Sequence, residues 1–142
     1  MTIARIIESK ISGVVSCETG VTVEEAAQLL AEHRIGALPV FEDGRIAGIF
    51  SERDLLYCIA KEGAAVLARR VGEVMTAPAI TVEPGTGILE ALALMTRRRI
   101  RHLPVVQHDQ VQGFVSIGDL VKYRIELVEA EAEQMREYIR TA

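Results

Sequence analysis

Residues 20–59 read GVTVEEAAQLLAEHRIGALPVFEDGRIAGIFSERDLLYCI, and residues 85–124 read GTGILEALALMTRRRIRHLPVVQHDQVQGFVSIGDLVKYR. The two stretches align without a gap, and thirteen of the forty aligned positions carry the same residue in both. Repetition of this kind indicates one structural unit that occurs twice. Because a unit of about 60 residues has only a marginal core, we expect the two copies to pack together around a pseudo-twofold axis.

The first copy predicts a helix, a β-hairpin and a second helix. Thr22 and Glu25 have the spacing of a capping box, and apolar residues follow them at helical intervals. Leu38 to Phe41 and Ile46 to Phe50 are β-prone, and they flank an Asp-Gly pair that is a strong hairpin signal. The chain then enters another helix after Ser51.

The second copy predicts the same elements. Its first helix follows the Pro84-Gly85 turn, with Thr86 as the expected N-terminal cap. Its hairpin strands are expected at Leu103 to Val106 and at Val111 to Val115.

A further short strand is expected before the first helix of each copy, at Val14 to Cys17 and at Ala79 to Val82. Each unit then reads strand, helix, strand, strand, helix. This order predicts an α/β (α+β) fold, in which each unit has a small three-stranded sheet and two helices. The stretch from Lys61 to Arg70, with a break at Gly63, is expected to join the units.

Composition excludes several classes of protein. The chain has 142 residues, of which 49% are apolar and 25% charged, and this is a globular composition. A net charge of −4 argues against a surface built for nucleic acid. No uncharged apolar run is long enough to cross a membrane, and Arg5, Glu8 and Lys10 interrupt the apolar stretch that a signal peptide would need. We therefore expect a cytoplasmic protein with no membrane contact.

Metal and thiol chemistry have little support in the sequence. Cys17 and Cys58 are far apart and form no metal-binding or redox spacing, so they are interpreted as small apolar residues. The three histidines are equally scattered. We expect no metal site.

The two copies resemble CBS domains, and the whole chain resembles a free-standing pair of them, a Bateman module. The resemblance covers about residues 3 to 128 and rests on the order and duplication of the family's motifs. These motifs are IGALPV at 35–40, GIFSERDL at 48–55, VGEVMT at 71–76, IRHLPV at 100–105 and GFVSIGDL at 113–120. The opening of the first copy, IIESKI at 6–11, departs from the family's usual Met-Thr ending.

The resemblance implies a division of the chain into four segments. Residues 1–62 would form the first CBS domain, 63–70 a linker, 71–128 the second CBS domain and 129–142 a helical extension.

The resemblance also implies two clefts between the units that accept adenosyl ligands, namely AMP, ADP, ATP, S-adenosylmethionine or a dinucleotide such as NAD. Ser51 with Asp54, and Ser116 with Asp119, lie where a strand is expected to run into a helix, an end rich in free N–H groups. An ionised Asp can accept both ribose hydroxyls, and a Ser can hydrogen-bond a phosphate oxygen. The alternative is that each Ser-x-x-Asp only caps its helix.

Other residues are assigned to the ligand by their position in the motifs. Arg101 is the phosphate candidate, because Arg can contact a phosphate with two hydrogen bonds. We expect one cleft to contain Ser116, Asp119, Ile80 and Arg101, with Arg53 reaching across the pseudo-dyad.

Adenine requires an apolar slot. Its candidates are Val15 and Ile80 on the leading strands, with Ala37 and His102 beside the Pro-Val motifs. The alternative interpretation of these four residues is ordinary core.

Binding is therefore the predicted function. No activated nucleophile, acid–base pair, phosphate loop or metal cluster indicates an enzyme. We expect a regulatory module that needs no cofactor, takes an adenine nucleotide as its ligand and acts on an unidentified partner protein. The alternatives are a structural interaction module with degenerate clefts and, less favoured, a nucleic-acid binder using the basic run 97–102.

The C-terminal region predicts a long helix and, with the family resemblance, a homodimer. No Gly or Pro follows Gly118, so a helix can continue to about Arg140. Apolar residues recur along it at alternating intervals of four and three, the spacing of a coiled-coil seam: Val121, Ile125, Val128, Ala132, Met135 and Ile139. The alternative is that the first turns pack on their own domain and the acidic remainder frays.

Overall fold

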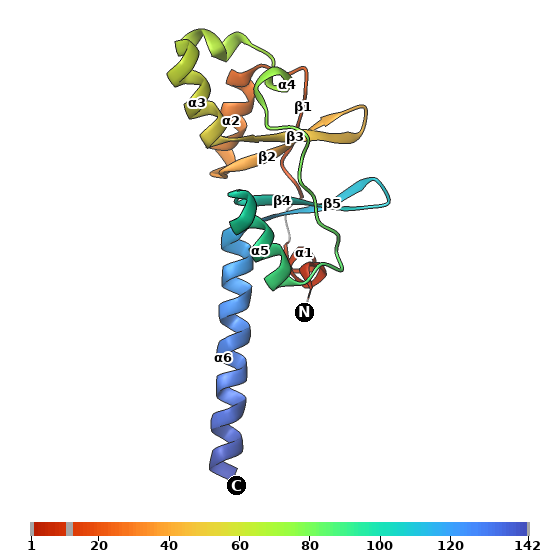
Figure 1. The fold of residues 1–142 in the computed structure, drawn as a ribbon, viewed down its shortest axis with the longest axis vertical. Helices are drawn as coiled ribbons and strands as arrows, with labels where there is room; N and C mark the ends of the chain where they lie inside the picture. Colours follow the sequence, from red (N-terminus) through yellow and green to blue (C-terminus); the bar gives the residue numbers. More distant parts are fainter. Residues whose placement is uncertain (1, 11–12, 142) are drawn as a thin grey trace.

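The computed structural model describes residues 2–10 and 13–141. Two small α+β units stack along the long axis of the molecule, and one long helix leads away from the second unit to the C-terminus (Figure 1). The stacked pair and the helical extension agree with the predicted architecture.

The first unit has the predicted hairpin and helices. Its elements are β1 (Cys17–Glu18), α2 (Val23–His33), β2 (Ala37–Glu42), β3 (Arg45–Ser51) and α3 (Glu52–Glu62). The strands lie in the order β1-β2-β3, with β1 parallel to β2 and β2 antiparallel to β3. Thr22 and Glu25 form the predicted capping box of α2. The Asp43-Gly44 turn has both residues at positive φ, 50° and 79°, as a tight hairpin requires.

The second unit contains α5 (Ile88–Arg98), β4 (His102–Gln107), β5 (Gln110–Ser116) and the start of α6 (Ile117–Thr141). Its sheet has two strands, so the expected third strand at Ala79 to Val82 is wrong in extent. Only Val82 pairs, as an isolated parallel bridge to Val105. The other leading strand is also shorter and later than expected, since β1 begins at Cys17. Residues just ahead of Cys17 and Val82, such as Val15 and Ile80, line the clefts and do not extend the sheets.

The expected cap of α5 is also wrong. Gly87 is the N-cap residue of this helix and provides no side-chain hydrogen bond. Thr86 instead closes the preceding turn, where its Oγ1 accepts a hydrogen bond from the Glu83 amide at 3.1 Å. Its carbonyl accepts another from the Ile3 amide at 3.0 Å, so Thr86 joins the N-terminus to the second unit.

Two separate hydrophobic cores stabilise the two units, and each core includes a short helix from the sequence ahead of the other repeat. The helix α1 (Ile3–Ser9) contributes the buried Ile3 and Ile6 to the second core. The helix α4 (Val71–Val74) contributes the fully buried Val71 to the first core. Figure 1 shows α1 beside the second unit and α4 beside the first. The chain therefore crosses from one unit to the other once before it builds each hairpin.

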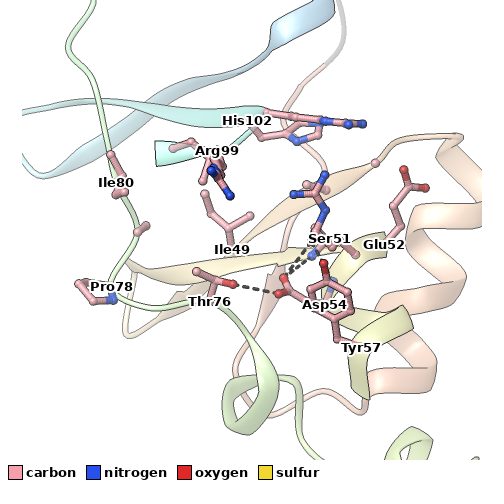
Figure 2. A pocket seen from close by; sticks show the side chains of 16 residues that line it. Ile49, Ser51, Glu52, Asp54, Tyr57, Thr76, Pro78, Ile80, Arg99 and His102 are labelled. Carbon is pink, nitrogen blue, oxygen red and sulfur yellow. Dashed lines mark hydrogen bonds between the residues drawn. The ribbon is translucent and has the colours of Figure 1, made fainter. Parts of the chain in front are cut away.

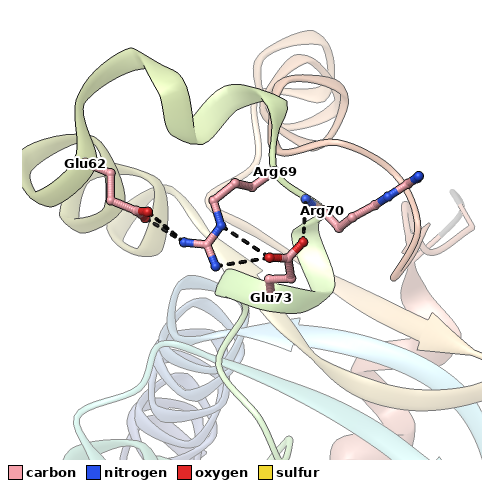
Figure 3. A network of polar contacts seen from close by, with 4 residues as sticks. All are labelled: Glu62, Arg69, Arg70 and Glu73. Carbon is pink, nitrogen blue, oxygen red and sulfur yellow. Dashed lines mark hydrogen bonds and ion pairs between the residues drawn. The ribbon is translucent and has the colours of Figure 1, made fainter.

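A polar network holds the connection between the units against the first one. Gly63, at φ 73°, ends α3 and begins the 3-10 helix η1 (Gly63–Ala68). After it, Arg69 donates to Glu62 at 2.7 Å and to Glu73 at 3.2 Å, as Figure 3 shows. These pairs are partly exposed, so each contributes at most about 1 kcal/mol. Their role is to join α3, η1 and α4 into one corner.

Among residues 2–10 and 13–141, no helix combines the length and the apolar character needed to span a membrane.

Candidate functional site

Two clefts open where the units face each other, related by the pseudo-twofold repeat. The first has a volume of about 420 Å³ and lies at the junction of β3 and α3. The second has a volume of about 500 Å³ and lies at the junction of β5 and α6. Both are within the size range of small-molecule sites.

The first cleft is built around Asp54 at the start of α3. Its Oδ2 accepts hydrogen bonds from the amide and the hydroxyl of Ser51, both at 2.9 Å. Its Oδ1 accepts a hydrogen bond from Thr76 Oγ1 at 2.9 Å (Figure 2). The Asp54 amide in turn donates to Ser51 Oγ at 3.1 Å, which completes a capping box. Asp54 is thus both a helix cap and a fixed carboxylate at the cleft wall.

Cationic side chains line the same cleft as this carboxylate, namely Arg53, Arg99 and Arg101. Within the described part of the chain, neither Arg53 nor Arg101 has a side-chain hydrogen-bond partner. Arg99 lies at the left-handed C-cap of α5, with φ 56°, as its repeat counterpart Arg34 does at the end of α2.

The second cleft has the same helix cap, but its carboxylate has a different partner. Asp119 Oδ2 accepts a hydrogen bond from the Ser116 amide at 2.8 Å. The same oxygen forms an ion pair with Lys10 Nζ at 2.8 Å, and Lys10 also donates to the Phe114 carbonyl at 2.7 Å. Burial works to raise the pKa of Asp119, but the hydrogen bonds from Lys10 and Ser116 outweigh it and lower that pKa. The carboxylate of the second cleft is therefore already paired within the chain.

His102 lies in the wall between the two clefts and lines both of them. Its ring stacks on Phe114, with 5.6 Å between the ring centres and 12° between their planes. Burial lowers the pKa of His102 below 6.5. The carboxylates of Asp119 and Glu52 oppose this shift, whereas the positive charges of Lys10 and Arg101 add to it. The lowered pKa favours the neutral imidazole near pH 7.

The structure groups the predicted residues differently from the sequence analysis. The first cleft is lined by Ala37, Ser51, Arg53, Asp54, Ile80, Arg101 and His102. The second cleft is lined by Val15, Ala37, His102, Ser116 and Asp119.

The expectation that one cleft joins Ser116 and Asp119 to Ile80, Arg101 and Arg53 is therefore wrong. The segment leading into the second repeat passes the strand-to-helix junction of the first repeat, so Ile80 lines the same cleft as Asp54. Arg53 lines the cleft of Asp54, which belongs to its own repeat, and so does not reach across the pseudo-dyad.

Two residues that contact the cleft carboxylates were not predicted. Thr76 ends the VGEVMT motif, and its hydroxyl reaches Asp54. Its counterpart in the repeat is Ile11, which lies outside the described residues. Lys10 corresponds to Met75, and this difference in the IIESKI opening was the available signal for the ion pair with Asp119.

This fold and these paired clefts define a tandem CBS-domain protein. The CBS-domain family model matches residues 6–61 and 71–126, so the chain belongs to the CBS-domain family.

Relatives are known both by sequence and by structure. The CBS domain-containing protein CBSX3, mitochondrial, of Arabidopsis thaliana is 39% identical over 128 residues. The match covers 87% of this chain and 62% of that protein, so this chain spans less than two thirds of the relative. The solved CBS-domain containing protein ATU1752 from Agrobacterium tumefaciens is 36% identical, with a TM-score of 0.83. Its match covers 87% of this chain and 99% of that one.

One structural neighbour was solved with ligands. The CBS domain pair of protein MJ0100, in complex with 5′-methylthioadenosine and S-adenosyl-L-methionine, has a TM-score of 0.76 and 22% identity. The match covers 87% of this chain and 94% of that one, and at this identity it shows the shared fold.

Proposed function

We propose that this protein is a regulatory module that binds an adenine nucleotide in its first cleft and transmits the binding event to a partner protein. The observation that carries the proposal is the pairing, in one cleft, of the fixed Asp54 carboxylate with the unpaired guanidinium groups of Arg53 and Arg101. The adenosyl ligands of the MJ0100 domain pair, which has the same fold, support the ligand class.

Each part of the ligand has a candidate partner. Asp54 accepts a hydrogen bond from a ribose hydroxyl through the lone pair of Oδ1 that Thr76 leaves open, because Ser51 already donates twice to Oδ2. Arg101 and Arg53 bind the phosphate oxygens. Ile80 and the neutral, stacked His102 provide the apolar contact for adenine.

Binding rather than catalysis is the proposed output. A nucleotide that contacts Asp54 from the first unit and Arg101 from the second changes the equilibrium between arrangements of the two units only if it binds one arrangement more tightly. A partner protein that recognises that arrangement then senses the nucleotide.

The test is calorimetric titration of the intact protein with AMP, ADP, ATP, NAD and S-adenosylmethionine, together with adenosine. We expect at least one nucleotide to bind and to raise the melting temperature. At a free ligand concentration of about 100 times the dissociation constant, one site adds roughly 2.7 kcal/mol to the free energy of unfolding. If no ligand gives heat or a thermal shift at millimolar concentration, the proposal fails and the structural interaction module is favoured.

Three variants assign the residue roles. Asp54→Asn should weaken adenosine and AMP alike, because both carry the ribose, and the loss of a charge-assisted hydrogen bond should cost about tenfold or more in affinity. Arg101→Ala should weaken AMP more than adenosine. The matched control is Asp119→Asn in the second cleft, which should leave both affinities unchanged. Equal losses for both ligands in the Arg101 variant would contradict the phosphate assignment.

A further inference from the structure

The C-terminal helix carries an exposed apolar stripe that its own unit does not cover. α6 is 25 residues long, which corresponds to about 37 Å, and Figure 1 shows it extending away from the body of the molecule. Its buried side is short and consists of Leu120 and the residues near it, which pack on the second core. The predicted seam lies on another side of the helix, where Ile125 is 52% exposed and Ile139 69% exposed.

The stripe has the heptad pattern of a coiled coil over its whole length. Val121, Val128 and Met135 take the d positions, and Ile125, Ala132 and Ile139 take the a positions. β-branched residues at two of the three a positions favour a two-stranded coil when the helices are parallel.

The charges beside the seam determine which orientation is favoured. In a parallel pair, each g residue faces the e residue five positions later on the partner helix. Arg124 then faces the partner's Glu129, and Glu131 faces the partner's Arg136. The twofold axis repeats both pairs, so every charged contact along the seam is between opposite charges.

The antiparallel arrangement brings like charges together. The register that overlaps all six core positions sets Val121 against the partner's Ile139 and places e beside e and g beside g. Glu129 and Glu131 would each face their own copies, and Lys122 would face the partner's Arg136. Like charges at these positions are destabilising.

We propose that α6 pairs with the α6 of a second copy of this chain as a parallel two-stranded coiled coil. The two second units then lie side by side at the start of the coil, in a head-to-head dimer. Because α6 begins at the Ser116–Asp119 cap, the coil is a direct continuation of the wall of the second cleft.

Cysteine crosslinking of the full chain tests the orientation. Ile139→Cys is placed in a Cys58→Ser background, which removes the other partly accessible thiol. In the parallel coil the two introduced thiols face each other and should form an interchain disulfide under mild oxidation. In the antiparallel coil they would be about 27 Å apart along the axis, so absence of the crosslink in a protein that is dimeric would overturn the proposal.

Charge reversal gives a second readout with opposite signs for the two orientations. Arg136→Glu faces the partner's Glu131 in the parallel coil, so we expect the dimer dissociation constant to rise on the order of tenfold. The double variant Glu131→Arg with Arg136→Glu should restore the dissociation constant. In the antiparallel coil Arg136→Glu would face Lys122, and a tighter dimer would overturn the proposal. Arg140→Glu is the matched control, since it makes the same charge change on the outer side of the helix.

Ile125→Asp tests whether the seam is the interface. Ile125 is exposed within one chain, so the variant should keep its circular dichroism spectrum and melt as a folded protein while light scattering shows a monomer. Ala130→Asp, on the outer side of the helix, is the control and should remain dimeric. A dimer that is insensitive to Ile125→Asp, or an intact protein that is monomeric at high micromolar concentration, would overturn the proposal. Because none of these variants lies in the first cleft, nucleotide titration of each remains an independent test of the proposed function.

Discussion

Lys10 makes the two clefts chemically different, because its ammonium group forms an ion pair with the carboxylate of Asp119. Asp54 in the first cleft has only hydroxyl and amide partners. We expect Lys10→Met, which introduces the residue found at the matching position 75, to leave Asp119 open to a ribose. Adenosine titration should then show a second binding event that the wild-type protein lacks. Lys61→Met is the control for loss of one positive charge. If the variant and the wild type bind with the same stoichiometry, Lys10 does not block the second cleft.

His102 predicts a loss of stability in mild acid. Burial, with the charge of Lys10 and of Arg101, lowers its pKa below 6.5 in the folded protein, although Asp119 and Glu52 oppose this. As the pH falls below 6.5, the unfolded chain binds a proton that folded His102 does not, so the free energy of unfolding decreases until the pH reaches the folded pKa. Above pH 6.5 the full stability is present.

Urea unfolding at a series of pH values tests this expectation. The stability of His102→Gln should fall less steeply than that of the wild type as the pH drops below 6.5. His33→Gln, at the exposed end of α2, is the control and should follow the wild-type curve. Identical slopes for the wild type and His102→Gln would assign the acid sensitivity to other groups.

Among the elements, β3 depends on a close approach of the chain that only glycine allows. A Cβ built on Gly48 would lie 2.6 Å from the Thr76 carbonyl and 2.8 Å from Met75 Sδ. At this point Ile49 and Thr76 exchange two backbone hydrogen bonds, both 2.9 Å long, and these hold Thr76 beside Asp54.

We therefore expect Gly48→Ala to destabilise the protein by about 1–3 kcal/mol and to weaken nucleotide binding, because the Thr76 segment must move. Gly85→Ala is the matched control, since its Cβ would meet no atom within 4 Å. Thermal unfolding and AMP titration of both variants provide the measurements. A Gly48 variant with wild-type stability would show that the segment can shift without loss.

The elements that sequence predicted correctly are those specified by local chemistry. The Asp43-Gly44 turn and the Thr22–Glu25 capping box depend on residues that are neighbours in the chain. The leading strands were predicted less well, because their length depends on contacts with the opposite unit. Only Val82 of the expected strand at Ala79 to Val82 reaches a partner, while Ile80 lines the cleft.

At the scale of the whole molecule, the sequence predicted many of the residues that line the two clefts, but not which of them share a cleft. The repeat shows that Ser51 matches Ser116 and that Asp54 matches Asp119, and it correctly places all four at strand-to-helix junctions. It does not show which leading segment passes which junction. That depends on the exchange of α1 and α4 between the cores, a long-range feature that leaves no periodic pattern in the sequence.

The same exchange predicts how the chain can be divided. A fragment ending at residue 62 lacks Val71, which is fully buried in the first core, and keeps Ile3 and Ile6, whose core it lacks. A fragment of residues 13–76 contains the whole first core, including α4. Burying one Val contributes about 1.5–3 kcal/mol, a decisive amount in a unit of this size.

We therefore expect fragment 13–76 to show a cooperative thermal transition by circular dichroism, and fragment 1–62 to show none or a transition at a clearly lower temperature. Val71→Ala in fragment 13–76 is the control, and it should lower the transition temperature toward that of the shorter fragment. If fragment 1–62 is the more stable of the two, α4 is not an essential part of the first core, and the unit boundaries follow the order of the sequence instead.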